Sequence, residues 1–340
     1  MRGLIPGVLA TAVLGLGAWL AGPYVPLAGG PLVALAAGAV LGNLRGVPAA
    51  WRPGVEFTVK RLLRLAIVLF GTTLSLGEVV ATGGGALLLI AVTVLTALAF
   101  TTSFGAWLHA PARLTGLIGI GTAICGATAI ITIGPILQSS AEEITFAVTT
   151  IFLFNALAVA VYPVLGHLLG LSDRLFGLWA GTAIHDTSSV VAAAYAYSDP
   201  AGQVATVVKL TRTLVLVPLA LAVAVGVSYR RAAEVRRGNA GTGEGQTAGA
   251  PVRIAAIFPW FVLWFAFAAL LHSMGMLPPA LVRGLGIAGK FLVVTVMAAV
   301  GLGADAAAMR RLGMRPLLIG LAAAVVVAVL SLTLARWLGS

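Results

Sequence analysis

Ionisable side chains lie inside long apolar stretches of this chain, where a charged group is costly and therefore marks a functional position. One stretch contains His185, Asp186 and Ser188 close together, and the next contains Lys209 and Arg212. Lys209 and Arg212 are three residues apart, so both side chains lie on one face of a helix. We expect these residues to meet near the middle of a membrane and to form a binding site.

A third cation, Lys290, lies inside a later apolar stretch. Three cations against Asp186 leave an excess of about two positive charges, which favours a small anion as the ligand. One charge pair at about 4 Å gains about 4 kcal/mol at an effective dielectric near 20, before desolvation. His185 is the proton-sensitive member of the set, because imidazole titrates closest to neutral pH.

A run of small and hydroxyl-bearing residues predicts a broken helix. It reads GIGTAICGATA over residues 119–129 and includes Cys125, Gly126 and Thr128. A broken membrane helix is tolerated only where its free amides and carbonyls line a cavity or find protein partners. A comparable run around Gly301 leads us to expect that both segments leave regular helix and cross near the bilayer centre. The tetrapeptide GTAI occurs at 121–124 and again at 181–184, which we interpret as chance or shared packing chemistry.

Several of these residues also have a structural interpretation. Asp186 with Lys209 or Arg212 would form a buried ion pair that locks two helices together. Cys125 suits close packing between helices, because it is small and only weakly polar. Asn155, in the preceding apolar stretch, is expected to be a hydrogen-bond partner between helices rather than a ligand. The anion site and the structural ion pair therefore stay open as alternatives.

The composition places these residues in a membrane. Of the 340 residues, 60% are hydrophobic and only 9% are charged, which is too few to cover a water-facing surface. A helix needs about 20 mostly apolar residues to cross a hydrocarbon layer of roughly 30 Å. The pattern predicts an all-α polytopic membrane protein of about eleven helices, the second of them short. The predicted spans are Leu4–Leu20, Pro31–Leu41, Leu62–Leu76, Leu87–Leu108, Leu114–Leu137, Ile144–Leu165, Leu175–Tyr197, Val204–Val227, Ile254–Leu271, Leu285–Leu302 and Leu317–Leu338.

The basic residues predict the orientation of the chain. The formal net charge is +11, and Lys and Arg concentrate in the short cytoplasmic loops of membrane proteins. With eleven spans and a cytoplasmic N-terminus, only Arg283 and Arg336 lie on the outer side. We therefore expect a multi-pass protein of the bacterial plasma membrane with its C-terminus outside. The basic loops are orientation signals beside anionic lipid rather than a nucleic-acid surface.

The two small-residue runs also predict an internal symmetry. Five spans separate them, and an odd offset is what an inverted repeat requires. We expect one transporter domain, residues 1–340, with a 5+5 inverted repeat of crossed discontinuous helices and one extra N-terminal helix. Residues 229–253 are rich in Gly, Arg, Thr and Ala, which predicts a flexible cytoplasmic linker between the eighth and ninth spans.

Enzyme chemistry is not expected. Cys125, His185 and Asp186 resemble a nucleophile, a base and an orienting group, but adjacent helical residues point about 100° apart, so His185 and Asp186 form no easy relay. The sequence contains no His-Glu-x-x-His motif and no nucleotide-binding loop, so we expect no metal, no cofactor and no ATP-driven pump. The expected function is secondary transport of a small anion, coupled to a proton or sodium and compatible with a homodimer. The alternative is a structural or sensory membrane protein that transports nothing.

At these residues the chain resembles the YeiH-type sulfate exporter family, from about Gly42 to Arg315. The resemblance is carried by AICGATAI at 123–130, His185-Asp186, VKLTR at 208–212, FPWF at 258–261 and AAVGL at 298–302. It implies a plasma-membrane carrier, distantly similar to bile-acid symporters and cation/proton antiporters, with crossed broken helices in two inverted repeats. It also implies export of sulfate, a related sulfur oxyanion or an organic anion. Where this chain has Ser189, the family commonly has a larger polar residue.

Overall fold

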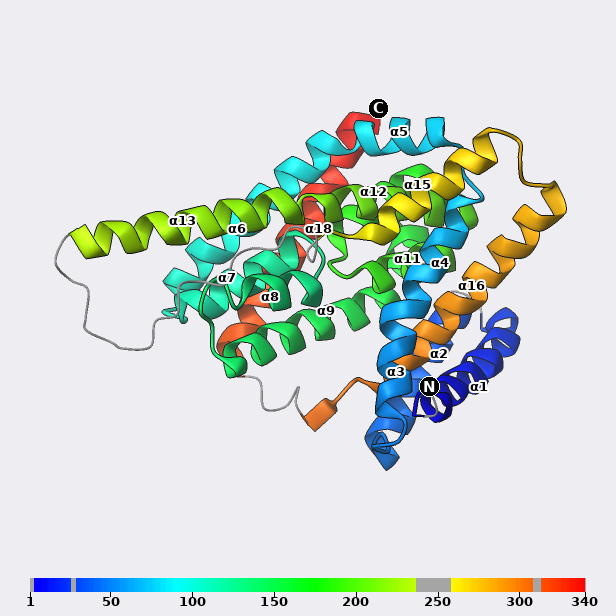
Figure 1. Cartoon of the computed structure of the whole chain (residues 1–340), viewed down its shortest axis with the longest axis horizontal. Helices are drawn as coiled ribbons and strands as arrows, with labels where there is room; N and C mark the ends of the chain where they lie inside the picture. Colours follow the sequence, from blue (N-terminus) through cyan, green and yellow to red (C-terminus); the bar gives the residue numbers. More distant parts are fainter. Residues whose placement is uncertain (1–2, 26–28, 237–257, 308–312, 340) are drawn as a thin grey trace.

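The computed structural model describes residues 3–25, 29–236, 258–307 and 313–339, and within them the regular structure is entirely helical. Figure 1 shows the helices crossing at oblique angles, with α11 and α12 near the middle of the molecule. The α-helices are α1 Ile5–Ala21, α2 Gly29–Arg45, α3 Arg52–Phe57, α4 Leu63–Gly71, α5 Leu76–Gly85, α6 Leu87–Trp107, α7 Ala112–Ala123, α8 Ala127–Ile133, α9 Ala141–Leu168, α10 Asp173–Ala183, α11 Thr187–Tyr197, α12 Asp199–Leu214, α13 Leu216–Arg236, α15 Trp260–Ser273, α16 Pro279–Leu302 and α18 Met314–Gly339. A short 3₁₀ segment, η1 Gly22–Tyr24, follows α1, and a π-helical turn, η2 Thr58–Leu62, joins α3 to α4.

Six of the described helical segments are long and apolar enough to cross a membrane. A seventh is counted if Arg52–Gly71 and Leu76–Gly85, which meet at 109°, form one span. These six are Ile5–Tyr24, Leu87–Trp107, Ala141–Leu168, Asp199–Gly226, Pro279–Leu302 and Met314–Leu338. The helical membrane class is thereby supported, whereas the count of eleven spans and the 5+5 repeat stay predictions.

Large apolar side chains on the outer helices face away from the protein. On α1, Leu9, Val13 and Leu20 are 58%, 68% and 62% exposed, and they share one side of the helix. On α18, Val325 and Val329 are similarly exposed. Contiguous apolar faces of this kind are costly in water but are what a lipid-facing helix requires.

Two of the predicted spans are broken in the middle. The first break, between α7 and α8, spans residues 124–126, and Gly126 adopts φ +65° and ψ −129°. The second break, between α10 and α11, spans residues 184–186, where Ile184 and Asp186 have extended backbone. The break predicted in the fifth span is therefore present, and an unpredicted one occurs in the seventh.

The break predicted around Gly301 in the tenth span is wrong, because α16 is one uninterrupted helix from Pro279 to Leu302. Glycine serves a different purpose there. A Cβ on Gly301 would overlap the carbonyl oxygen of Leu35, and one on Gly38 would overlap that of Ala298. The glycines let the backbones of α2 and α16 approach closely, as small residues do between membrane helices.

Capping residues set the ends of the helices around the breaks. Ser140 and Glu143 form a reciprocal capping box at the start of α9, and the Ser172 hydroxyl caps α10. Ser198 has extended backbone, separates α11 from α12, and accepts a hydrogen bond from the Ala201 amide at 3.1 Å. This tight turn returns α12 along both α10 and α11, which brings the residues of α12 beside the second break.

The predicted linker lies only partly in the described structure. Helix α13 continues through Arg236, so its last turns occupy residues 229–236, where a flexible segment was expected. The remainder of the predicted linker, residues 237–253, lies outside the described residues.

Candidate functional site

Lys209, on α12, donates hydrogen bonds to backbone carbonyls at both breaks. Its ammonium lies 2.9 Å from the Ile124 oxygen, 3.0 Å from the Ile184 oxygen, and also contacts the carbonyl oxygen of His185. The side chain is 0% exposed. An ammonium group has three N–H donors, so carbonyl oxygens use the full donor capacity of Lys209.

Arg212 lies one helical turn further along α12 and binds the same two breaks. Its Nε donates to the Ala123 carbonyl at 2.7 Å, and one Nη donates to that of Thr122 at 2.6 Å. The other Nη donates to the Thr182 carbonyl. Arg212 is also 0% exposed, and three of the five N–H donors of its guanidinium are used in these bonds.

These bonds provide partners for the backbone carbonyls that a break in a membrane helix leaves without hydrogen bonds. The last carbonyls of a helix lack intrahelical partners and carry a partial negative charge of about 0.5 of an electron in total. Helices α7 and α10 both end in the middle of the protein, where water cannot compensate those carbonyls. Lys209 and Arg212 supply the missing donors and the opposite charge to both ends at once.

The repeated tetrapeptide GTAI occupies the same place in both broken helices. Residues 121–124 end α7 and residues 181–184 end α10, and carbonyls within both tetrapeptides accept from the α12 cations. Of the two interpretations of this match, chance and shared packing chemistry, the structure favours the second. The match marks the two helix ends that one pair of cations joins.

Asp186 forms no direct ion pair with either cation in the structure as described, which corrects the expected pair. Its carboxylate instead caps α11 and accepts from the Ser188 amide at 2.9 Å, the Ser189 amide at 3.3 Å and the Ser188 hydroxyl. The reason is local competition: helix-end carbonyls take the donors of the cations, and the free amides of α11 take the carboxylate oxygen. The described ion pairs are Lys60–Glu56 and Lys290–Asp199.

Asn155, in the middle of α9, holds the second break from the other side. Its Oδ1 accepts from the backbone amides of His185 and Asp186, at 3.1 Å each. Its Nδ2 lies 3.6 Å from the position where a Cβ on Gly126 would stand, so Asn155 also borders the first break. The prediction of a hydrogen-bond partner between helices is confirmed for Asn155.

Cys125 and Gly126 lie within the first break and against the second. Cys125 is buried, and a Cβ on Gly126 would stand 3.5 Å from the Cβ of Asp186. Thr128, the second residue of α8, is exposed at the surface of the protein. The backbone amides of Cys125 and Thr128 donate to no protein acceptor in the described part of the chain, so the break presents hydrogen-bond donors that a ligand could use.

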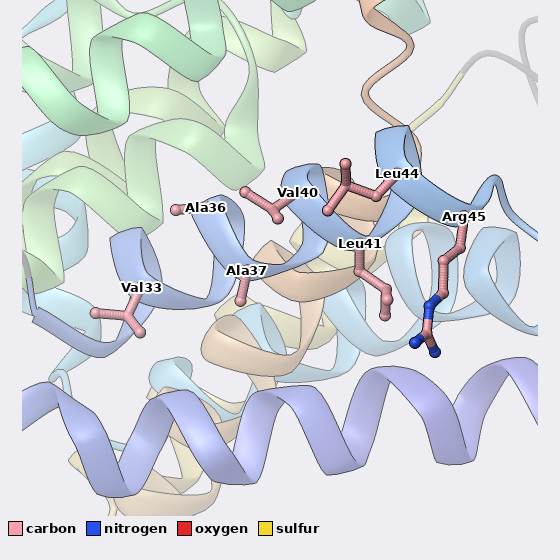
Figure 2. Close-up of a pocket in the computed structure, with 7 residues that line it drawn as sticks. All are labelled: Val33, Ala36, Ala37, Val40, Leu41, Leu44 and Arg45. Atoms are coloured by element: carbon pink, nitrogen blue, oxygen red, sulfur yellow. The ribbon is translucent and has the colours of Figure 1, made fainter.

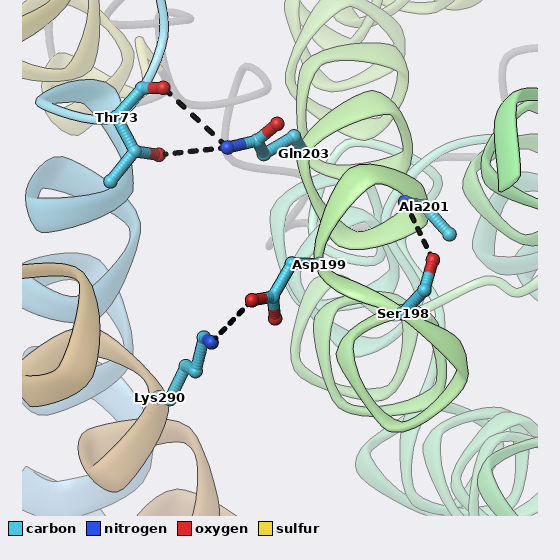
Figure 3. A network of polar contacts seen from close by, with 6 residues as sticks. All are labelled: Thr73, Ser198, Asp199, Ala201, Gln203 and Lys290. Carbon is cyan, nitrogen blue, oxygen red and sulfur yellow. Dashed lines mark hydrogen bonds and ion pairs between the residues drawn. The ribbon is translucent and has the colours of Figure 1, made fainter. Parts of the chain in front are cut away.

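Lys290 does not join the cluster, which corrects its predicted place. It lies on α16 and pairs with Asp199 at 2.6 Å, at the start of α12 and beside a second contact between Gln203 and Thr73 (Figure 3). The side chains of Lys290 and Asp199 are 33% and 60% exposed. Lys290 therefore belongs to the end of α12 opposite to Lys209 and Arg212.

The charge at the breaks is smaller than the sequence predicted. Without Lys290, two cations, Lys209 and Arg212, stand against one carboxylate, Asp186, which leaves an excess of one positive charge when all three are ionised. The partial negative charge of the two helix ends reduces that excess further. The pair of breaks therefore suits a single negative charge better than a multiply charged ligand.

Two buried polar atoms at the breaks have no partner in the described structure, namely the His185 Nδ1 and the Thr122 Oγ1. The Thr182 hydroxyl, at the matching position of the other tetrapeptide, donates instead to the Leu178 carbonyl at 2.6 Å. Buried polar atoms are rarely left without partners, so these two are groups that a polar ligand, a proton or a water molecule would satisfy. No group of three or more His, Cys, Asp or Glu side chains close enough to hold a metal ion occurs among the described residues.

Sequence reasoning found the two cations, the first break and Asn155, and it missed the helix-end carbonyls that the cations bind. The signal for these carbonyls was the repeated GTAI tetrapeptide.

Broken, apolar helices whose buried ends are joined by charged side chains define a polytopic helical membrane protein with a polar centre. The chain belongs to the family described as conserved hypothetical protein 698, whose model matches residues 6–320, and this confirms the resemblance to the YeiH-type family. A "UPF0324 membrane protein" of Clostridium tetani is 34% identical over 335 residues, 98% of this chain and 97% of its own length. The "UPF0324 membrane protein SAG1125" of Streptococcus agalactiae is 33% identical over 345 residues, 99% of this chain and 98% of its own length.

Proposed function

We propose that this protein is a secondary transporter of a small anion. The observation that carries the proposal is the position of two fully buried cations, Lys209 and Arg212, at the joint between two broken helices. A structural helix pair needs no break, and a break in a membrane helix is tolerated where its backbone groups serve a cavity or a ligand. The unsatisfied amides and the positive excess at this joint favour an anion as that ligand.

The bonds of the cations suggest how an anion is held. All three donors of Lys209 go to carbonyls, so Lys209 acts on the anion through its field and through the shape of the breaks. Arg212 retains two N–H donors beyond its three bonds. These donors and the amides of Cys125 and Thr128 are the groups that we propose contact the substrate, with Gly126 keeping the backbone open. Ser188 donates its single O–H to the Asp186 carboxylate, so we propose that Ser188 acts on the site by orienting Asp186.

The transport cycle that fits this site is alternating access around the breaks. We propose that the 5+5 inverted repeat and the eleven spans of the sequence interpretation provide the two moving parts, and that a proton or sodium drives the cycle. His185, whose Nδ1 has no partner among the described residues, is the proposed proton carrier. Sulfate, a related sulfur oxyanion or a small organic anion is the proposed substrate class, and export is the proposed direction. Within this class the excess of one positive charge at the breaks favours a singly charged form, such as hydrogensulfite or a monocarboxylate, over the sulfate dianion.

The proposed setting is the bacterial plasma membrane, with the N-terminus in the cytoplasm, the C-terminus outside, and two copies forming a homodimer. The distribution of basic residues along the chain supports this orientation. The large exposed apolar faces of α1 and α18 support the membrane setting.

The alternative is a membrane protein that transports nothing and uses the cations only to hold its helices together. The observation in its favour is the complete use of the Lys209 donors on backbone carbonyls. The non-transporting alternative predicts no anion flux, whether or not the protein binds the anion, whereas a carrier moves labelled anion down its gradient.

The test is anion flux into liposomes that contain the purified full chain, with sulfate, sulfite, thiosulfate and small organic anions as the panel. We expect uptake of at least one anion above protein-free liposomes, and retention of that uptake in Lys290→Gln, because Lys290 lies away from the breaks. The absence of flux for every anion, in protein that remains folded and inserted, would refute the proposal. Equal flux for every anion tested would point to a leak rather than to a binding site.

A further inference from the structure

Helix α2 has two faces of different character. One face carries Gly38 and Gly42, which lie so close to α16 that an added Cβ would overlap α16 carbonyl oxygens. The opposite face forms a shallow, widely open groove of about 740 Å³. The groove is lined by Val33, Ala36, Ala37, Val40, Leu41, Leu44 and Arg45 (Figure 2).

Arg45 ends the groove and is the one charged side chain that lines it. Figure 2 shows its guanidinium turned to the same side of the helix as Leu41 and Ala37. Arg45 is exposed and makes no hydrogen bond or ion pair with the described residues. A free guanidinium at the end of an apolar groove offers a bidentate site for a phosphate oxygen pair.

The length of the groove matches one leaflet of a bilayer. From Val33 to Arg45 the helix rises about 18 Å, at 1.5 Å per residue. Half of a hydrocarbon layer of roughly 30 Å is about 15 Å. When the apolar part of the groove lies in the hydrocarbon, Arg45 therefore reaches the level of the headgroups.

We propose that this groove is a binding site for an anionic phospholipid, with an acyl chain along α2 and the phosphate against Arg45. Charge complementarity favours a lipid with net negative charge over a zwitterionic one, because the latter brings its own cation to Arg45. A second copy of the chain fits less well. The groove is lined by one helix and seven residues, whereas a stable protein interface buries roughly 1,200 Å² or more and involves about 20 residues on each side.

The experiment compares lipid retention by the purified full chain in a neutral detergent, using native mass spectrometry. Phosphatidylglycerol and phosphatidylcholine with the same acyl chains are the two probes, and thermal unfolding is followed on the same samples. We expect phosphatidylglycerol to be retained preferentially and to raise the melting temperature. Arg45→Gln should weaken its retention by about tenfold, through loss of charge-assisted bonds to phosphate, whereas Arg45→Lys should lose less.

Two further variants separate the parts of the site. Arg283→Gln, which removes an exposed charge at the other end of α16, should retain phosphatidylglycerol like the wild type. Ala37→Phe should fill the groove and lower the retention of both lipids while leaving Arg45 in place. Equal retention of the two lipids by the wild type, or unchanged retention in Arg45→Gln, would overturn the proposal. A lipid-free dimer that Ala37→Phe converts to a monomer would assign the groove to a second copy instead.

Discussion

Lys209 and Arg212, one helical turn apart on α12, bind six carbonyl oxygens that belong to the ends of two broken helices. Neither cation is satisfied by a carboxylate in the described residues. The two broken helices are therefore joined through α12, and any motion of α12 relative to them changes how their carbonyls are compensated. This arrangement holds the two helix ends together and places two buried positive charges at the joint.

The first prediction concerns Lys209, whose replacement by methionine keeps the length of the side chain and removes all three donors. Lys209→Met leaves the carbonyls of Ile124, Ile184 and His185 without their buried partner, and each such group costs about 1–3 kcal/mol. We expect a large fall in the melting temperature measured in detergent. Lys290→Met is the control, because it breaks an exposed pair worth about 0–1 kcal/mol. Equal effects of the two changes would show that the carbonyl bonds of Lys209 contribute little.

The second prediction tests whether Asp186 and Arg212 act as an ion pair. A buried pair that loses one partner is destabilised by about 3–5 kcal/mol, and removing the second partner then restores stability. Here the carboxylate caps α11 and the guanidinium binds carbonyls, so no such rescue is expected. Asp186→Ala, which removes the cap and the charge, and Arg212→Gln should each destabilise the protein, and their double mutant should lose about the sum of the two. Thermal unfolding of the four proteins checks this cycle, and recovery of stability in the double mutant would restore the ion-pair interpretation.

The third prediction concerns the backbone of the first break. Gly126 has φ +65° and ψ −129°, a conformation that costs a residue with a side chain about 1–3 kcal/mol. Space is not the obstacle, because an added Cβ would meet Ile151 at 3.4 Å and Asp186 at 3.5 Å. Gly126→Ala should therefore lower the melting temperature through the backbone alone.

The control for this change is Gly116→Ala, in the regular part of α7, where the nearest atom to an added Cβ is 3.9 Å away. Alanine there should be neutral or stabilising by up to about 1 kcal/mol, because it favours the helix. Similar melting temperatures for both variants would mean that the conformation of Gly126 is not strained for other residues.

The sequence predicts some residues of the joint and leaves its backbone partners unpredicted. The polar positions Lys209 and Arg212 were found because a charge inside an apolar stretch is costly and their spacing places them on one helix face. Gly126 was correctly predicted to lie in a break, whereas the break predicted at Gly301 is absent. Glycine occurs both in helix breaks and where two helices approach closely, and only the position of the neighbouring helix distinguishes the two cases. Lys290 was wrongly predicted to lie beside Lys209 and Arg212, because its position along its span gives its depth in the membrane and not its lateral position. The carbonyl partners of the cations lie outside side-chain patterns altogether, and only the GTAI repeat hinted at them.

The last prediction separates transport from structure at Asn155. Its Oδ1 accepts from the amides of His185 and Asp186, so Asn155→Ala should destabilise the second break by about 1–3 kcal/mol. Asn155→Asp keeps an oxygen acceptor for both amides, but it buries a second carboxylate beside Asp186. The aspartate variant should therefore retain these two bonds and be less stable than the wild type, so its flux is compared with that of an equal amount of folded, inserted wild-type protein.

Asn155→Asp should strongly reduce anion transport. A second carboxylate beside Asp186 cancels the excess of one positive charge that Lys209 and Arg212 supply, so the site no longer attracts an anion. We expect anion flux in Asn155→Asp to fall by at least about tenfold at neutral pH, where one unit of charge at this depth is worth more than 1.4 kcal/mol. Flux and thermal unfolding should be measured on the same liposome preparations. Wild-type flux in folded and inserted Asn155→Asp protein would remove the electrostatic argument for an anion, while lost flux in folded and inserted protein would support a role of the charge at the breaks in attracting the substrate.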